Sequence, residues 1–197
     1  MMNEEYKSLA VQYLTGTVQV SQPISPHPVT FKSPAIEVMT DLRTIQAAVI
    51  SPYITMQTAN TYMIQRGVRT LLVINDNNSL AGIITATDIL GEKPMLFIQE
   101  RGVKHSEIMV LDMMTPLNKL EAIPLEEVMH ARVGNIVASL RESDRLHALV
   151  IDDPTIGPPR ICGIFSWTQI EKQLGTVIPQ NNVARSFAEI ESSLIAH

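Results

Sequence analysis

Residues 70–90 read TLLVINDNNSLAGIITATDIL, and this stretch decides the fold. The apolar run 71–74 is followed by the polar turn 75–78, where Asn and Asp bond their own backbone and tolerate left-handed geometry. A second apolar run, 81–84, comes after the turn. Two short apolar runs joined by a polar turn predict a β-hairpin. The Thr and Asp residues of 85–88 then predict a helix start, because their side chains cap free backbone N–H groups.

The same pattern returns in the second half of the chain. HALVIDD at 147–153 corresponds to the first apolar run, and CGIFSWTQI at 162–170 corresponds to the second. Upstream of each, VMTDL at 38–42 corresponds to MMTPL at 113–117. Ordered matches at similar spacing indicate an internal repeat. The chain is therefore predicted to be a tandem duplication in which each half forms a strand, a helix, two strands and a helix.

Composition sets the broad class of protein. The 197 residues, 45% apolar and 18% charged, are ordinary for a globular protein. Each half alone would build only a marginal core, so the two halves are expected to pack on one another. A net charge of −5 with scattered basic residues does not indicate a basic surface that would bind nucleic acid. No apolar run approaches the roughly 20 residues that span a bilayer, so no membrane association is expected.

The single cysteine, Cys162, excludes an intramolecular disulfide. It lies inside an expected strand without a CxxC partner or a base, which favours a buried apolar role over that of a nucleophile. The first residues, MMNEE, are acidic, unlike the basic start of a signal peptide. A cytoplasmic location is the expectation.

The first part of the chain is expected to form an extended arm that lies on the domain or on a partner subunit. Prolines at 23, 26, 28 and 34 forbid a long helix there. A short amphipathic helix over 6–14 and a short edge strand at Val18 and Val20 are expected before them. The expected organisation is an arm at 1–35, a first repeat at 36–105, a second repeat at 106–175 and a tail at 176–197 with a helix around 184–194.

The hairpin and the helix start after it resemble the CBS (cystathionine-β-synthase-type) domain. The resemblance covers roughly residues 36–175 and includes GIITATD at 82–88, which is similar to the family's Gly-x-x-Thr-x-x-Asp ribose signature. It implies an α/β fold of the α+β type, with two β-α-β-β-α repeats packed sheet to sheet as one pseudo-symmetric module. It also implies a homodimer that binds an adenosine compound, namely AMP, ADP, ATP or S-adenosylmethionine, in clefts between the repeats.

The chemistry of the signature suits a nucleotide. An ionised carboxylate at Asp88 accepts hydrogen bonds from ribose hydroxyl groups, and Thr85 adds a hydroxyl three residues earlier. The N-terminus of the following helix suits phosphate. Arg69 is the candidate cation for that phosphate, and Ile50 and Ile84 are candidates for the adenine wall.

Simpler readings of these residues stay open. Thr85 and Asp88 form a pattern that often does nothing more than cap a helix. Arg69 is equally well a solvated surface residue. Ile50 and Ile84 are explained by core packing alone.

The second half departs from the signature, since Gln169 stands where the family has Asp. Gln169 still forms hydrogen bonds but carries no charge, and Ser166 preserves the hydroxyl. A weaker second site is therefore expected at Ser166, Gln169 and His147, although His147 is more often a structural histidine than a ligand.

Three classes of function compete. The leading hypothesis is a stand-alone regulatory sensor that binds an adenosine compound and signals to an unknown effector protein or through its oligomeric state. The alternative is a ligand-independent dimerisation or interaction module. An enzyme is not expected, because the sequence has no nucleophile–base set, Walker-type glycine loop or metal-spaced His/Cys cluster. No cofactor is expected to be required beyond the regulatory adenosine ligand.

Overall fold

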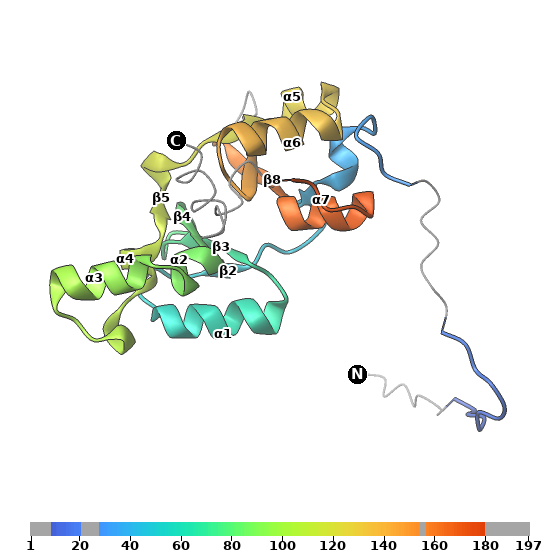
Figure 1. Ribbon diagram of the computed structural model, residues 1–197, viewed down its shortest axis with the longest axis horizontal. Helices are drawn as coiled ribbons and strands as arrows, with labels where there is room; N and C mark the ends of the chain where they lie inside the picture. Colours follow the sequence, from blue (N-terminus) through green and yellow to red (C-terminus); the bar gives the residue numbers. More distant parts are fainter. Residues whose placement is uncertain (1–8, 21–27, 154–156, 180–197) are drawn as a thin grey trace, which may run out of the picture.

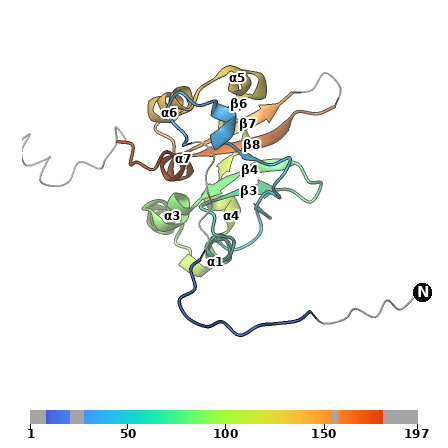
Figure 2. The ribbon, with the colours of Figure 1, turned by 90° about the vertical axis from the view of Figure 1, so that its right-hand side faces the viewer.

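The computed structural model describes residues 9–20, 28–153 and 157–179. Two four-stranded sheets lie face to face in the middle of the molecule (Figures 1 and 2). Helices α1 and α3 lie outside one sheet, and α5 and α6 lie outside the other (Figure 2). This two-sheet α/β architecture is the fold class that the sequence predicts.

The two repeats have the predicted order of elements. The first repeat consists of β2 (Val49–Ile50), α1 (Met56–Arg66), β3 (Thr70–Ile74), β4 (Leu80–Thr85) and α2 (Ala86–Leu90). The second repeat consists of β6 (Ala122–Pro124), α6 (Val133–Glu142), β7 (His147–Asp152), β8 (Arg160–Ser166) and α7 (Trp167–Leu174), with the extra helix α5 (Leu125–His130) after β6. In both repeats the first strand pairs in parallel with the second, and the last two strands form an antiparallel hairpin.

The connection between the repeats is largely helical. It contains α3 (Lys93–Arg101), η2 (His105–Glu107), α4 (Val110–Met113), β5 (Thr115–Pro116) and η3 (Leu117–Lys119). Before the first repeat come η1 (Ala35–Val38) and β1 (Thr40–Asp41).

The two repeats exchange strands. β1 precedes the first repeat but pairs with β8 of the second, while β5 pairs with β4 of the first. Two glycines permit these close pairings: a Cβ at Gly82 would collide with the carbonyl oxygen of Thr115, and one at Gly163 would collide with the side chain of Met39. Each sheet therefore contains a strand that lies next to the other repeat in the sequence. This pairing holds the two repeats together.

Each repeat has its own buried core. The first core gathers α1, β3, β4 and α4 around Met56, Leu71 and Ile84. The second gathers η1, α6, β8 and α7 around Phe165 and Trp167. Cys162 is buried in the second core as predicted, and burial raises the pKa of its thiol.

The structure corrects several expectations for the arm. Residues 9–14 are not helical, and Val18 and Val20 lie in no strand. Every residue from 9 to 20 is exposed, so this segment does not lie on the domain. The end of the arm does lie on it, because the backbone carbonyls of Phe31 and Ser33 accept hydrogen bonds from the N–H groups of Gly134 and Val133. A helix this short is marginal in water without an apolar surface to pack against. The expected helix around 184–194 falls outside the described residues.

Candidate functional site

The site begins where β4 ends and α2 starts. The backbone N–H and the hydroxyl of Thr85 both donate to Oδ2 of Asp88, at 2.9 and 2.7 Å. In return the backbone N–H of Asp88 donates to Oγ1 of Thr85, at 3.2 Å. This reciprocal arrangement is a capping box, and it fixes both side chains at the N-terminus of α2.

Lys93 completes the surroundings of the Asp88 carboxylate. Its ammonium group lies 3.1 Å from Oδ1 of Asp88 and also donates to the backbone carbonyl of Met113. A carboxylate has about four acceptor positions, and Thr85 and Lys93 fill three of them. One position on Oδ1 is left for a further donor. The carboxyl side chain is 17% exposed, so this position can be reached from outside.

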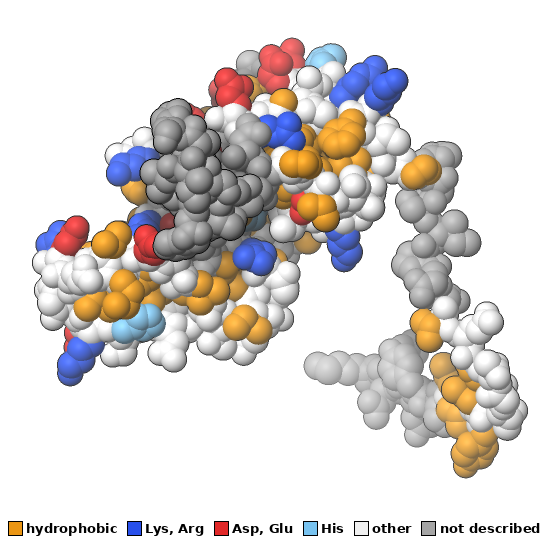
Figure 3. All heavy atoms as spheres, viewed as in Figure 1, with side chains coloured by type: hydrophobic (Ala, Val, Ile, Leu, Met, Phe, Trp, Pro, Cys, Tyr) orange, Lys and Arg blue, Asp and Glu red, His pale blue; other side chains and the backbone are white. Residues whose placement is uncertain are grey.

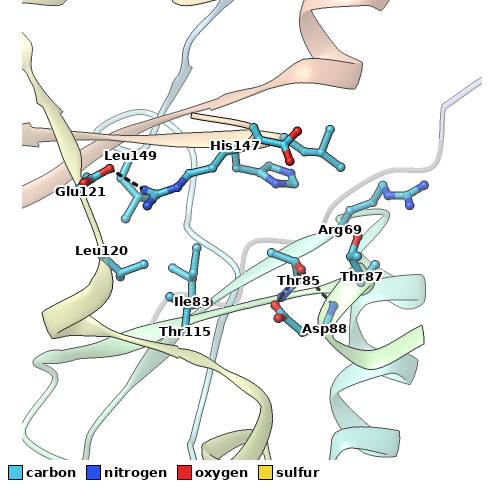
Figure 4. Close-up of a pocket in the computed structure, with 14 residues that line it drawn as sticks. Arg69, Ile83, Thr85, Thr87, Asp88, Thr115, Leu120, Glu121, His147 and Leu149 are labelled. Carbon is cyan, nitrogen blue, oxygen red and sulfur yellow. Dashed lines mark hydrogen bonds and ion pairs between the residues drawn. The ribbon is translucent and has the colours of Figure 1, made fainter. Parts of the chain in front are cut away.

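A cavity of about 580 Å³ opens beside this pair, between the two repeats (Figure 4). We call it the first cavity. From the first repeat it is lined by Arg69, Thr85, Thr87 and Asp88, and from the second by His147 and Leu149. Its volume is in the usual range for small-molecule sites.

The same cavity carries further charged groups. Arg145 and Glu121, which form an ion pair at 3.1 Å, line it together with Asp144 (Figure 4). Negative and positive groups are therefore mixed along its wall.

A second cavity of about 370 Å³ lies at the corresponding place in the other repeat. His147 faces Ser166 across β7 and β8, as Thr70 faces Thr85 across β3 and β4. The second cavity is lined by Arg66, Arg69, Thr70, His147, Ser166 and Gln169, among others. Arg69 and His147 line both cavities, which therefore share one wall.

His147 is the titratable group between the two cavities. Burial, aided by the positive charge of Arg69, lowers its pKa to about 4. The imidazole is therefore neutral near pH 7, where one ring nitrogen donates and the other accepts a hydrogen bond.

Residues 35–94 match the model of the CBS domain family. Those residues hold β1, all of the first repeat and the Thr85–Asp88 pair, and the second repeat copies their topology. The chain has the fold of a CBS-domain pair. No curated protein matches the sequence.

Solved structures support the assignment of the fold. An uncharacterised conserved protein of Pyrococcus horikoshii is 21% identical, with a TM-score of 0.54 over 77% of this chain and 98% of that one. The CBS-pair protein CBSX2 of Arabidopsis thaliana, in complex with AMP, is 19% identical with a TM-score of 0.50 over 71% of this chain and 94% of that one. The CBS-domain pair of protein MJ0100, in complex with 5′-methylthioadenosine and S-adenosyl-L-methionine, is 16% identical with a TM-score of 0.50 over 75% and 98%.

The predicted site residues do not all come together. Arg69, Thr85, Asp88 and His147 line the first cavity, and Ser166 and Gln169 lie with Arg69 and His147 at the second. The two groups form where paired strands end: Thr85 lies at the end of β4, and His147 faces Ser166 at the ends of β7 and β8.

The two isoleucines lie elsewhere. Ile84 is fully buried in the first core and does not line either cavity, whereas its neighbour Ile83 lines the first. Side chains alternate along a strand, so Ile83 shares the face of Thr85 and Ile84 takes the opposite one. Ile50 lines a separate hollow of about 550 Å³ with Tyr62 and Asp76. Alternation could have identified Ile83 from the sequence.

Lys93, Glu121 and Arg145 were not among the predicted residues. They reach the site through the helical connection and through the second repeat, and no local sequence pattern marks them. The described part of the chain contains no group of three or more His, Cys, Asp or Glu residues arranged to hold a metal ion. None of its helices is long and apolar enough to cross a membrane.

Proposed function

We propose that this CBS pair is a cytoplasmic regulatory sensor that binds an adenosine compound in the first cavity and catalyses no reaction. The observation that carries the proposal is the Thr85–Asp88 pair at the wall of a cavity shared by both repeats. AMP, ADP, ATP and S-adenosylmethionine are the candidate ligands.

The lining of the first cavity offers a partner for each part of such a ligand. A ribose hydroxyl donates to the remaining acceptor position on Oδ1 of Asp88, and a charge-assisted bond of this kind is about twice as strong as a neutral one. Ile83 and Leu149 offer apolar surface for the base. Arg69 lies on the same wall and supplies positive charge for a phosphate.

Two of the structures with this fold favour an adenosine ligand. CBSX2 was solved with AMP, and the MJ0100 pair with 5′-methylthioadenosine and S-adenosyl-L-methionine. All three ligands carry an adenosine moiety, which is the part that the Thr85–Asp88 pair would recognise here.

The position of the cavity suits regulation. Its lining comes from both repeats, so a ligand contacts both at once. A ligand that fits one arrangement of the repeats better than another shifts the population toward it, by an amount set by the difference in affinity. An effector protein or a change of oligomeric state would report that shift.

The proposal includes a homodimer. Leu90, Met95 and Leu96 are 69%, 58% and 55% exposed, and hydrophobic side chains gather on the face that carries α3 (Figure 3). Covering them against a second copy would remove apolar surface from water. Sedimentation velocity of the wild type against Leu96→Glu tests this, with Met129→Glu on α5 of the other repeat as the control.

A ligand-independent interaction module is the second candidate. The observation that favours it is the closure of the capping box, because Thr85 and Asp88 satisfy one another without any ligand. In that case the pair serves only to start α2.

A thermal-shift screen with AMP, ADP, ATP, S-adenosylmethionine and adenosine separates the two candidates. A ligand that binds only the folded state raises the melting temperature. The sensor requires a shift with at least one compound, and the shift disappears in Asp88→Ala. Thr55→Ala, which removes the cap of α1 away from both cavities, must retain the shift. Unchanged melting temperatures with all five compounds would favour the interaction module.

A further inference from the structure

One edge of the first sheet is open. Its strands have the order β2-β3-β4-β5, and among the described residues β2 has a neighbour on one side only. The carbonyl of Ala48 accepts a hydrogen bond from the N–H of Leu72 on β3. Backbone groups alternate in direction along a strand, so those of Val49 point away from β3. An edge of this kind is a template for pairing with a further strand.

The hollow of about 550 Å³ that Ile50 lines lies beside this edge. We call it the edge hollow. β2 and Ser51 form one side of it, and the face of α1 that carries Thr58, Tyr62 and Gln65 forms another. Its described lining belongs entirely to the first repeat and shares no residue with the first or the second cavity. The edge hollow is therefore separate from the space between the repeats.

The edge hollow suits an uncharged, partly apolar occupant. Ile54, Tyr62 and Ile74 are half-buried in its wall, while Thr61 and Asp76 are exposed. Asp76 is the single charged side chain among the described residues that line it. An apolar wall with a few polar groups matches a side chain such as tyrosine, which has an apolar body and a polar tip.

The N-terminal arm has this character. Residues 8–31 contain no Asp, Glu, Lys or Arg, although 18% of the chain is charged. Val11 and Tyr13 are 95% and 98% exposed. Figure 1 shows the arm (blue) standing clear of both sheets, and Figure 3 shows hydrophobic side chains along it. An exposed apolar segment of this kind marks a surface that binds another protein surface.

The sequence of the arm is typical of a strand. Val, Tyr and Thr favour strands, and Val11, Tyr13 and Thr15 stand at every second position. Side chains two residues apart share one face of a strand, so in a strand Val11 and Tyr13 point the same way. Gly16, with a φ of 74°, ends this stretch. Within its own chain the arm pairs with no described strand.

We propose that residues 11–15 of a second copy of this chain add to the open edge of β2, with Val11 and Tyr13 in the edge hollow. Main-chain hydrogen bonds to an edge strand supply affinity, and pockets for alternate side chains supply specificity. Ile54 and Ile74 offer apolar surface to the tyrosine ring, and Asp76 offers an acceptor for its hydroxyl group. Each copy gives its arm to the other, so the contact closes as a two-fold dimer.

A second copy, rather than the same chain, supplies the arm. The arm leaves the domain at the second repeat, where the carbonyl of Phe31 accepts from the N–H of Gly134, whereas the open edge belongs to the first repeat. α1 and α3 lie outside the same sheet (Figure 2), so a copy that covers the α3 face lies on the side of the edge hollow. Residues 9–20 span up to about 40 Å when extended, which lets the arm reach a neighbouring copy. The arm contact rests on the proposed homodimer but uses different residues from the α3 face.

Disulfide cross-linking of two mixed variants tests the contact. Full-length Tyr13→Cys and isotopically labelled Gln65→Cys are mixed in equal amounts and oxidised by air. Mass spectrometry is expected to find the two introduced thiols joined between an unlabelled and a labelled chain. Gln57→Cys is the matched control, because Gln57 and Gln65 are both exposed glutamines of α1 and only Gln65 lines the edge hollow. Cys162 is buried and is present in every variant.

The pattern of links decides the outcome. Links that form preferentially with Gln65→Cys support the contact. Equally frequent links with Gln57→Cys, or no link between labelled and unlabelled chains, would overturn it. A chain that carries both Tyr13→Cys and Gln65→Cys tests the arm against its own domain, and a link that forms only within one chain would also overturn the proposal.

Sedimentation velocity of Tyr13→Asp gives an independent measurement. A carboxylate placed in the edge hollow beside Asp76 is expected to weaken self-association about tenfold or more, because a buried charge loses its hydration. Gln12→Asp is the control: Gln12 is also exposed but points to the other side of a strand, so its self-association stays within about twofold of the wild type. Both positions are exposed in the single chain, so neither change disturbs the core. Equal weakening by the two variants would contradict the proposed contact.

The arm contact and the α3 contact can fail separately. Tyr13→Asp leaves the α3 face and the first cavity unchanged, and Leu96→Glu leaves the arm and the edge hollow unchanged. A dimer that Leu96→Glu dissociates, without any cross-link from Tyr13→Cys to Gln65→Cys, would refute the arm contact alone.

Discussion

His147 of the second repeat and Arg69 of the first line both cavities between the repeats. The guanidinium group lies close enough to oppose protonation of the imidazole, and burial of the ring opposes it further. A single pair of side chains thus connects the two candidate ligand sites, and its charge state depends on pH.

Acid is expected to destabilise the fold through His147. The pKa of His147 is about 4 in the folded chain against 6.5 as its ordinary value, so between these values the unfolded state binds more protons. Stability therefore falls as pH falls from about 6.5 to about 4, and at pH 5 the loss is about 2 kcal/mol.

Urea unfolding of the wild type and His147→Gln at pH 7 and pH 5 measures this contribution. The carboxylates of Asp88 and Asp144, which line the same cavity, are present in both proteins. Their contribution therefore cancels in the difference between the two unfolding free energies. An equal loss of stability on acidification in both proteins would show that His147 is not the group responsible.

Removing the capping box is expected to lower the stability of the fold as well as to weaken ligand binding. Asp88→Ala leaves the N-terminus of α2 without its carboxylate, and the loss of such a cap is about 1 kcal/mol. Thr55→Ala removes the comparable cap of α1, where Thr55 accepts from the backbone N–H of Thr58. Thermal unfolding is expected to show similar decreases for both variants, and a decrease in Thr55→Ala alone would show that Asp88 does not stabilise α2.

Lys93→Met is expected to tighten adenosine binding. The lysine occupies an acceptor position on Oδ1 of Asp88, and its removal frees that position for the second ribose hydroxyl. One added hydrogen bond predicts a gain of about two- to tenfold in affinity. The free energy of unfolding changes by less than about 1 kcal/mol, since Lys93 is half-exposed. Weaker binding in calorimetry would mean that Lys93 itself contacts the ligand.

The strand exchange predicts unequal effects for two glycines. Gly82→Ala drives a Cβ into the backbone carbonyl of Thr115, so β5 must shift, and overpacking of this kind costs roughly 1–3 kcal/mol. Gly163→Ala meets the side chain of Met39, which can change rotamer, so its cost is smaller. Denaturant unfolding that ranks Gly163→Ala as the more damaging variant would contradict the close backbone approach of β5 to Gly82 of β4.

Local pattern was sufficient to predict the repeats. The run 70–90 contains a hairpin and a helix cap in contiguous sequence, so short-range rules identify β3, β4 and α2 and their counterparts in the second half. The position of Thr85 and Asp88 at one end of the hairpin follows from the same rules.

Contacts between distant parts of the chain were not predictable in this way. The pairing of β1 with β8 joins Thr40 to Ile164, and the contact of Lys93 with the carbonyl of Met113 depends on how α3 turns back after α2. Two-residue strands have too little periodicity to reveal their partners. The sharing of Arg69 between the cavities likewise depends on how the repeats pack.

The most direct test of the sensor is a calorimetric comparison of adenosine and 2′-deoxyadenosine on the wild type, Asp88→Ala and Thr55→Ala. Recognition of the ribose by Asp88 predicts that the wild type and Thr55→Ala bind adenosine more tightly than the deoxy compound, and that Asp88→Ala loses this preference. Equal affinities of the wild type for the two compounds, or a preference that survives in Asp88→Ala, would contradict the account.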